Sequence, residues 1–273
     1  MPTSQLDRLQ QALRPRGLRF VEGRRGALKL RAAGDQKTRM RPVVGRRERE
    51  WLLLEQPAGQ RRSCVEALRR QTGVVFAKYV ALAPGGPISI RADLPLTPEL
   101  LDAPDLLEAL LAAAVTPGSA ARGAGEGAGE ILGLIRTALG ERGHTEDTES
   151  GFELKVQPAA GQARVLLVKL STETVRFSLR LARAAELATG DLEVVAAYCL
   201  CLNAEHYLGR IGLEDHRPVA ELVLPIRDVT PHFCHMAVDA VLSFTTREQA
   251  LGLLIGDARA RGLYARHFGL ATT

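Results

Sequence analysis

Cysteine and histidine side chains cluster in the later part of the sequence, and metal binding is the first chemistry that they could support. Zinc sites usually place roughly two to four residues between paired cysteines, so that both thiolates face one ion. Cys199 and Cys201 have a single residue between them, and in the helix predicted there they project to nearly opposite faces. We therefore interpret the group as core thiols and surface histidines, and we predict no metal and no other cofactor. The residues considered are Cys199, Cys201, His206, His232, Cys234 and His235.

Nucleophilic catalysis is the second chemistry that the sequence could support. Cys234 and His235 are adjacent, but neighbouring side chains point apart, and a nucleophile needs a base beside it in space and a third group to orient that base. Neither of the common phosphate-binding glycine motifs follows a predicted strand. The stretch from Gly123 to Gly129 is rich in glycine but precedes a helix with no strand before it, which is typical of a linker. The sequence therefore predicts no catalytic residue and no enzyme activity.

Arginines concentrate early in the chain and form a candidate partner-binding basic patch. Arginine suits phosphates and carboxylates alike, so three interpretations stand: nucleic acid, an acidic protein partner, or a solvated face. Proteins that bind single-stranded nucleic acid usually add aromatic stacking platforms, and Trp51 is the only aromatic residue near these arginines. Direct binding of nucleic acid is therefore the less favoured of the two partner hypotheses. The patch comprises Arg39, Arg41, Arg46, Arg47, Arg49, Arg61 and Arg62.

Charge and composition limit the class of protein. Hydrophobic residues make up 46% of the 273 residues and charged residues 25%, which is typical of globular proteins with a buried core. Residues 1–115 hold 20 basic and 12 acidic residues, a net charge of +8, whereas the rest of the chain has a net charge of −3. The first residues lack the apolar run of a signal peptide, and no stretch approaches the roughly 18 apolar residues of a membrane span. We expect a cytoplasmic protein with free thiols.

The sequence on either side of residues 116–129 contains the same pattern twice. That segment has five glycines and no large apolar side chain, so it cannot repay its ordering entropy by burial and is predicted to be a flexible linker. Five short matches follow one another in the same order, and their offset drifts only from 126 to 131, which indicates an internal repeat. The matches are 12–17 with 138–143, 28–30 with 154–156, 76–82 with 207–213, 94–96 with 224–226, and 108–110 with 239–241.

Each copy is predicted to contain a helix, strands, a second helix, a hairpin and a third helix. Strands that come in hairpins imply an antiparallel sheet with helices packed on it, so the fold class is α+β. In the first copy we expect helices at 4–16, 61–72 and 98–115, and strands at 18–21, 27–31, 39–44, 51–55, 75–82 and 87–93. In the second copy we expect helices at 130–142, 191–205 and 231–243, strands at 152–156, 164–170, 174–181, 206–213 and 218–224, and a tail helix at 246–266.

This arrangement, with a hairpin that ends in Leu-Pro-aliphatic, resembles the YbjN family of bacterial proteins, whose fold is similar to type III secretion chaperones. The best local marks are Asn203, the stretch 207–211, and the strand 219–224 followed by Pro225. The first copy departs from it, since Thr72-Gly73 stands where the second copy has Asn203-Ala204, and it has an apparent extra basic strand. The resemblance implies a non-enzymatic protein that dimerises and holds a client. YbjN proteins are described as regulators linked to stress responses, and the resemblance supplies no catalytic residue to carry over.

The predicted domains are a basic first module in residues 1–115, a linker in residues 116–129, and a second module with an extra C-terminal helix in residues 130–273. The predicted function is that of a protein-binding adaptor or chaperone-like regulator. The alternative is an accessory protein of nucleic acid that acts through the basic first module or through a DNA-binding partner. We expect a homodimer or an internal pseudo-dimer, with the tail helix covering the other module or a second chain.

Overall fold

The computed structural model describes the chain in segments, and everything below concerns those segments alone. Elements up to Pro95 are referred to as the first half, and elements from Ala128 onwards as the second half. The helices predicted at 4–16 and 98–115 and most of the predicted linker lie outside the described residues, although Gln11 is helical. The described residues are 11, 19–22, 28–31, 39–44, 50–58, 63–71, 77–95, 128–157, 162–182, 187–226 and 229–270.

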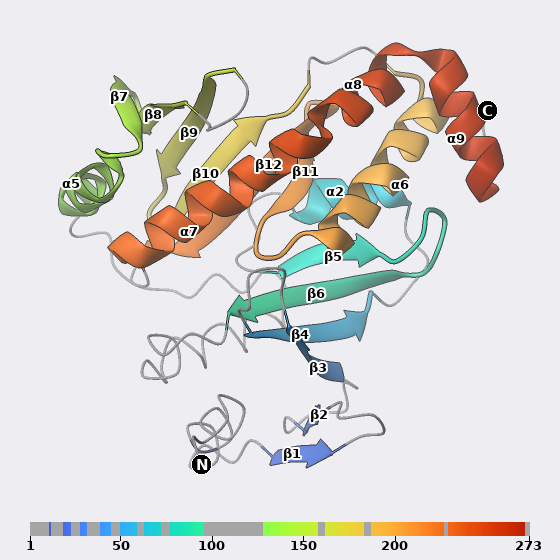
Figure 1. Cartoon of the computed structure of the whole chain (residues 1–273), viewed down its shortest axis with the longest axis horizontal. Coiled ribbons are helices and arrows are strands. Elements are labelled where there is room, and N and C mark those ends of the chain that lie inside the picture. Colours follow the sequence, from blue (N-terminus) through green and yellow to red (C-terminus); the bar gives the residue numbers. More distant parts are fainter. Residues whose placement is uncertain are drawn as a thin grey trace.

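The first half forms one antiparallel sheet with a helix beside it (Figure 1). Its strands are β1 (Arg19–Glu22), β2 (Leu28–Arg31), β3 (Arg39–Val44), β4 (Glu50–Pro57), β5 (Ala77–Ala81) and β6 (Ile88–Pro95), and helix α2 (Cys64–Gln71) lies between β4 and β5 in sequence. The strand order across the sheet is β1-β2-β3-β4-β6-β5. Strand β5 therefore forms one edge of the sheet.

The second half forms another antiparallel sheet, covered by α5 and α7. Its strands are β7 (Gly143–Thr148), β8 (Gly151–Val156), β9 (Arg164–Leu170), β10 (Thr174–Arg180), β11 (Arg210–Glu214) and β12 (Arg217–Pro225). Its helices are α5 (Ala128–Leu139), α6 (Thr189–Glu205), α7 (Pro231–Leu242), α8 (Glu248–Gly256) and α9 (Ala258–Phe268), with the 3-10 turn η4 (Ser243–Arg247) after α7. Read from β7, the strand order is β7-β8-β9-β10-β12-β11, the same order as in the first sheet.

The predicted α+β class with antiparallel sheets is confirmed, and one strand was missed. Strand β7 has the sequence GHTEDT, which has no apolar alternation, so its position in the sheet is not apparent from the sequence. Four described strands thus precede the central helix in both halves, and the apparent extra strand of the first copy has a counterpart. Helix α5 also begins at Ala128, two residues inside the predicted linker.

The β11–β12 hairpin shows how local sequence sets the sheet edge. Glu214 pairs with Arg217, which leaves Asp215 and His216 as a two-residue turn. Both turn residues have positive φ, 44° and 62°, the backbone of the turn type whose twist matches that of paired strands. In the first half, Gly85 (φ 72°) supplies the positive φ within the longer β5–β6 turn.

The interior of the second sheet is packed by alternating apolar residues. Phe152, Leu166, Val175 and Phe177 are fully buried, and α7 packs across β10 and β12 on this side. The buried apolar cluster continues into the first half through Leu68 of α2. Within the described part of the chain, no helix is both long and apolar enough to cross a membrane.

The tail differs from the single helix predicted at 246–266. It consists of α8 and α9 with a break at Asp257, whose carboxylate accepts hydrogen bonds from the backbone N–H groups of Arg259 and Ala260 and so begins α9. Both helices pack against α6 of their own half, and buried Arg261 forms an ion pair with Asp191 at 2.7 Å. The end of the tail reaches the first half, where a Cβ added at Gly85 would lie 2.9 Å from Leu270 Cδ2.

Candidate functional site at the junction of the two sheets

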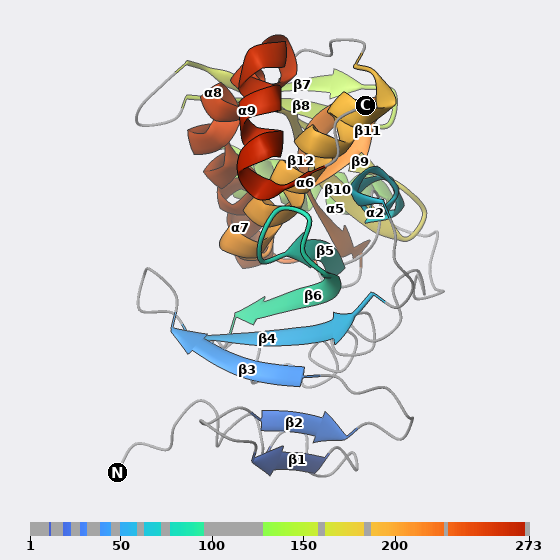
Figure 2. The same cartoon turned by 90° about the vertical axis from the view of Figure 1, so that its right-hand side faces the viewer.

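The two sheets meet at their β5 and β11 edges, and we refer to this region as the junction. Helix α2 of the first half packs against β11 and α6, while α6 of the second half packs against β5 and α2, so the contacts are reciprocal. Both views show α2 and α6 between the sheets (Figures 1 and 2). The junction also contains β6 and β12, whose buried charged residues face β5 and β11.

Two buried amide side chains make matching hydrogen bonds across the junction. Gln71, at the end of α2, accepts a bond from the N–H of Tyr79 at 2.7 Å and donates to the carbonyl of Ile211. Asn203, near the end of α6, accepts a bond from the N–H of Ile211 at 2.6 Å and donates to the carbonyl of Tyr79 at 3.2 Å. Each amide therefore binds the edge strand of its own half and that of the other half.

Two buried cations, Lys78 and Arg210, also bind the facing half. Each directly precedes the edge-strand residue that the two amides bind. Lys78 Nζ donates to the carbonyl of Gly209 at 3.2 Å, and Arg210 Nη1 donates to the carbonyl of Ala77 at 2.6 Å. The two cations differ by 132 in residue number, as do Gln71 and Asn203, which perform the same task. The matching bonds thus relate Asn203 to Gln71 at an offset of 132, whereas the offset of 131 predicted for this region relates Asn203 to Thr72.

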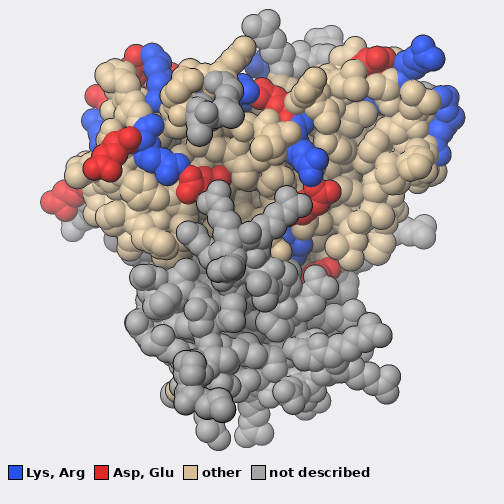
Figure 3. Space-filling model, in the orientation of Figure 1, with Lys and Arg blue, Asp and Glu red and all other residues tan. Residues whose placement is uncertain are grey.

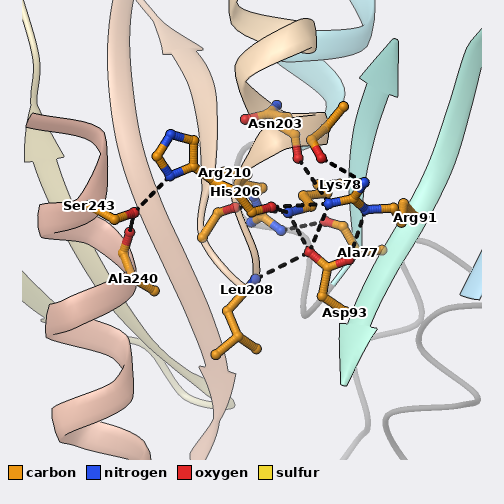
Figure 4. A network of polar contacts seen from close by, with 12 residues as sticks. Ala77, Lys78, Arg91, Asp93, Asn203, His206, Leu208, Arg210, Ala240 and Ser243 are labelled. Atoms are coloured by element: carbon orange, nitrogen blue, oxygen red, sulfur yellow. Dashed lines mark hydrogen bonds and ion pairs between the residues drawn. The ribbon is translucent and has the colours of Figure 1, made fainter. Parts of the chain in front are cut away.

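Helix ends on both sides of the junction receive opposite charge from the other half. The last turn of α6 contains no basic residue of its own. Arg91 of β6 binds its terminal carbonyls instead, donating to Ala204 at 2.8 Å and to His206 at 3.1 Å (Figure 4). At the other helix, the first N–H of α2, that of Cys64, donates to the carboxylate of Glu193 at 2.9 Å. Both arrangements place charge where it stabilises the helix dipole.

Asp93 lies at the centre of the first-half charges and is fully buried. Its carboxylate accepts from Lys78 Nζ at 2.5 Å, from Arg91 Nε at 2.8 Å and from the N–H of Leu208 at 3.2 Å (Figure 4). Burial by itself would raise the pKa of Asp93, but the charges of Lys78 and Arg91 and their hydrogen bonds hold it below the usual value. Burial lowers the pKa of Lys78 to about 7, against the attraction of Asp93.

The second half compensates its buried cation differently. Glu221 is fully buried and accepts from Arg210 Nε at 2.8 Å and from Arg176 Nε at 2.6 Å. Arg176 in turn forms an ion pair with Glu214. These charges are paired with one another or with the backbone of the facing half, and an arrangement of this kind binds two surfaces together. It presents no activated nucleophile.

His206 and Ser243 lie beside the junction and could be mistaken for a catalytic pair. His206 Nδ1 lies 3.0 Å from Ser243 Oγ, and Ser243 Oγ donates to the carbonyl of Ala240 at 2.7 Å (Figure 4). The serine proton is thus engaged by the backbone of α7, and the imidazole ring stacks on Phe244 with ring centres 4.2 Å apart. This geometry joins the end of α6 to the end of α7.

The predicted basic patch is not part of the junction as described. Arg39 and Arg41 belong to β3, but their side chains lie outside the described residues, as do all parts of Arg46, Arg47, Arg49, Arg61 and Arg62. On the face of the second half shown in Figure 3, basic and acidic side chains are interspersed. The patch therefore stays a prediction.

The cysteines are free thiols, as predicted. Two of them, Cys64 of α2 and Cys201 of α6, are close enough at the junction to interact electrostatically. Cys199 and Cys234 are buried, and Cys64 and Cys201 are partly buried. Among the residues that the structure describes, no three histidine, cysteine or acidic side chains come close enough together to hold a metal ion. Burial raises the pKa of Cys64 to about 12, assisted by Glu193, and raises the pKa of Cys201 and of Cys234 to about 11.

We expect these thiols to react with a maleimide at pH 8 at least about tenfold more slowly than free cysteine, because the raised pKa lowers the thiolate fraction. Mass spectrometry of timed samples measures the rate for each residue, and a urea-unfolded sample is the control. The raised pKa values also predict that the contribution of Cys201 and Cys234 to stability is constant below about pH 9 and falls as pH rises towards 11. Rapid labelling of Cys201 in the folded protein would contradict this expectation.

The sequence did not indicate that the junction residues act together: Asn203 and the stretches 207–211 and 219–224 stood out only as family marks, and Gln71, Lys78, Arg91 and Asp93 did not stand out at all. One signal is present in the sequence: each edge strand carries a basic residue at or next to its start, Lys78 in AKYVA and Arg210 in RIGLE, directly before a large apolar residue. Comparisons of the chain with protein-family models, with curated proteins and with solved structures found no match.

Proposed function

We propose that the chain is a non-enzymatic adaptor or chaperone-like regulator that holds a partner protein, built from two YbjN-like modules in residues 1–115 and 130–273. The observation that carries partner binding is the open outer edge of the second sheet, strand β7. It pairs with β8 on one side and with no other described strand. An unpaired edge offers backbone hydrogen bonds to an extended segment of another protein.

The common strand order of the two sheets supports the tandem duplication. A random pair of six-stranded sheets has no reason to share an order in which the last two strands are exchanged, nor to place a helix between the fourth and fifth strands. The reciprocal bonds of Gln71 with Asn203 and of Lys78 with Arg210 support an internal pseudo-dimer. The four free cysteines agree with a location in the reducing cytoplasm.

The register of the β7–β8 hairpin identifies which backbone groups are available. Thr148 pairs with Gly151 across a two-residue turn, and such closing pairs are hydrogen bonded. Because hydrogen-bonded and non-bonded pairs alternate, the N–H groups of Thr145 and Asp147 point away from β8. Side chains along this strand and its turn are exposed and acidic at Glu146, Asp147 and Glu149. This edge fits an extended segment with basic or polar side chains.

A proline at Thr145 tests this function. Thr145→Pro removes one outward N–H and leaves the β7–β8 hydrogen bonds intact, so we expect at least a tenfold loss of partner recovery in affinity purification from the native host. Thr145→Val is the matched control, because it keeps the N–H and a branched side chain, and it should recover partners as the unchanged chain does. Equal recovery by the proline variant, with an unchanged melting temperature, would contradict binding at β7.

The second candidate is an accessory protein of nucleic acid, favoured by the net charge of +8 in residues 1–115. Binding through phosphates would weaken steeply with salt, because each neutralised phosphate releases a counterion. A chain with Arg46, Arg47 and Arg49 changed to glutamine would lose that binding, whereas Thr145→Pro would not. Titration of a labelled oligonucleotide at two salt concentrations therefore separates the two functions.

A further inference from the structure

The junction carries the same bonding scheme twice, and this allows its two halves to be compared position by position. Lys78 lies opposite Arg91 in the β5–β6 pair, and Arg210 lies opposite Glu221 in the β11–β12 pair. Because Lys78 and Arg210 make corresponding bonds to the facing strand, Arg91 and Glu221 occupy corresponding positions. One is a buried cation and the other a buried anion.

The opposite charges of Arg91 and Glu221 affect which of the two halves can pair at this surface. Arg91 faces the C-terminal carbonyls of α6, where positive charge is favourable. If two second-half surfaces met in the same geometry, Glu221 would take that place and confront the negative end of the helix. Arg210 and Arg176 of its own half would still pair with Glu221, but neither would offset its repulsion from those carbonyls, so the contact favours a cation and disfavours a second Glu221.

Two first-half surfaces would be poorly matched for the opposite reason. Each would bring Lys78 and Arg91 into the interface with only Asp93 to compensate them. The pairing would bury four cations, Lys78 and Arg91 of each half, against two anions. Like-charge juxtaposition of this kind selects against the wrong partner.

We infer that the junction is one self-complementary surface present twice in the chain and made selective for unlike halves by the opposite charges of Arg91 and Glu221. The partner that each surface fits is the other half of this protein, and a second copy of the same half is rejected. This inference rests on the proposed duplication and is independent of partner binding at β7.

A chain that can be cut between its halves tests the inference. A specific protease site is inserted between Gly123 and Ala124, the purified protein is cut, and native mass spectrometry at micromolar concentration gives the mass of every species. We expect a single complex that contains one first half and one second half. Complexes of a half with itself would overturn the selectivity, and free halves would overturn the junction as a self-sufficient interface.

The charge at Arg91 is tested in the same cut protein. Arg91→Glu is expected to raise the dissociation constant of the two halves by at least about 100-fold, as loss of a buried charged contact does. Arg70→Glu makes the same charge change on the exposed side of α2, where the Arg70 side chain is 54% exposed. This control should leave the dissociation constant of the two halves within about threefold of that of the unchanged protein. Arg91→Lys keeps the positive charge, so the two halves of this variant should still pair only with each other. That result would show that the effect of Arg91→Glu comes from the reversed charge and not from a general loss of folding.

Circular dichroism of each uncut variant verifies that it folds before cutting. If cut Arg91→Glu halves associate as tightly as the unchanged ones, the inference is wrong. A failure of the Thr145→Pro test would leave all of these results unaffected, so the two proposals can fail separately.

Discussion

An Asp93→Ala chain is expected to lose about 3–5 kcal/mol of unfolding free energy, because it leaves two buried cations without their carboxylate. Lys78 and Arg91 would keep only backbone carbonyls as partners, and the N–H of Leu208 would lose its acceptor. Both halves should be affected, since these residues connect β5 and β6 to the end of α6. Denaturant unfolding followed by circular dichroism measures the loss.

The effect of Asp93→Ala should depend on pH in a defined direction. Burial holds the pKa of Lys78 at about 7, and removal of the Asp93 charge would lower it further. Above that pH, Lys78 is neutral in both folded proteins and needs no counterion, so the difference in stability should be smaller at pH 9 than at pH 6. Arg91 remains charged, so a deficit persists at both values.

Asp147→Ala is the matched control for this change. Asp147 also forms an ion pair with an arginine, Arg136, but its side chain is 75% exposed. Water replaces the lost partner of an exposed charge, so this variant should unfold at nearly the same denaturant concentration as the unchanged chain. Equal effects of the two substitutions would show that the buried carboxylate of Asp93 does not stabilise the junction.

Gly151→Ala is expected to cost about 3 kcal/mol of stability through a backbone clash. A Cβ on Gly151 would lie 1.9 Å from the carbonyl oxygen of Val168 on the neighbouring strand β9, and backbone cannot yield without breaking the β8–β9 pairing. The turn that joins β7 to β8 is fastened at this point by the N–H of Leu170, which donates to the carbonyl of Ser150 at 2.9 Å. The midpoint of thermal unfolding should fall accordingly.

Gly252→Ala is the control for the glycine substitution. Gly252 is an exposed residue of helix α8, and a Cβ there would meet nothing within 4 Å. Alanine is the better helix former by up to about 1 kcal/mol, so this variant should be slightly more stable than the unchanged chain. If Gly151→Ala unfolds at the same temperature as Gly252→Ala, then β8 and β9 can move apart at little cost in free energy.

Much of the framework follows from the sequence alone, because short-range patterns determine it. Apolar alternation and turn residues located most of the strands, including β3 at 39–44 and β9 at 164–170 with the observed bounds. The continuous apolar helix at 189–205 was predicted within two residues. These features depend on neighbours along the chain, whose spacing the sequence displays directly.

Only the tertiary structure shows which polar residues are buried and bonded at the junction. By residue type alone, Lys78, Arg91, Asp93 and Arg210 would be expected to face solvent, yet all four are buried. Their burial depends on the meeting of two sheet edges and two helices, and the bond from Arg91 to Ala204 spans 113 residues of sequence. Strand β7 was missed for a related reason: its polar residues acquire strand geometry from pairing with β8, not from an apolar face of their own. A charge becomes structural only when distant segments remove water from it, and no local pattern records which segments those are.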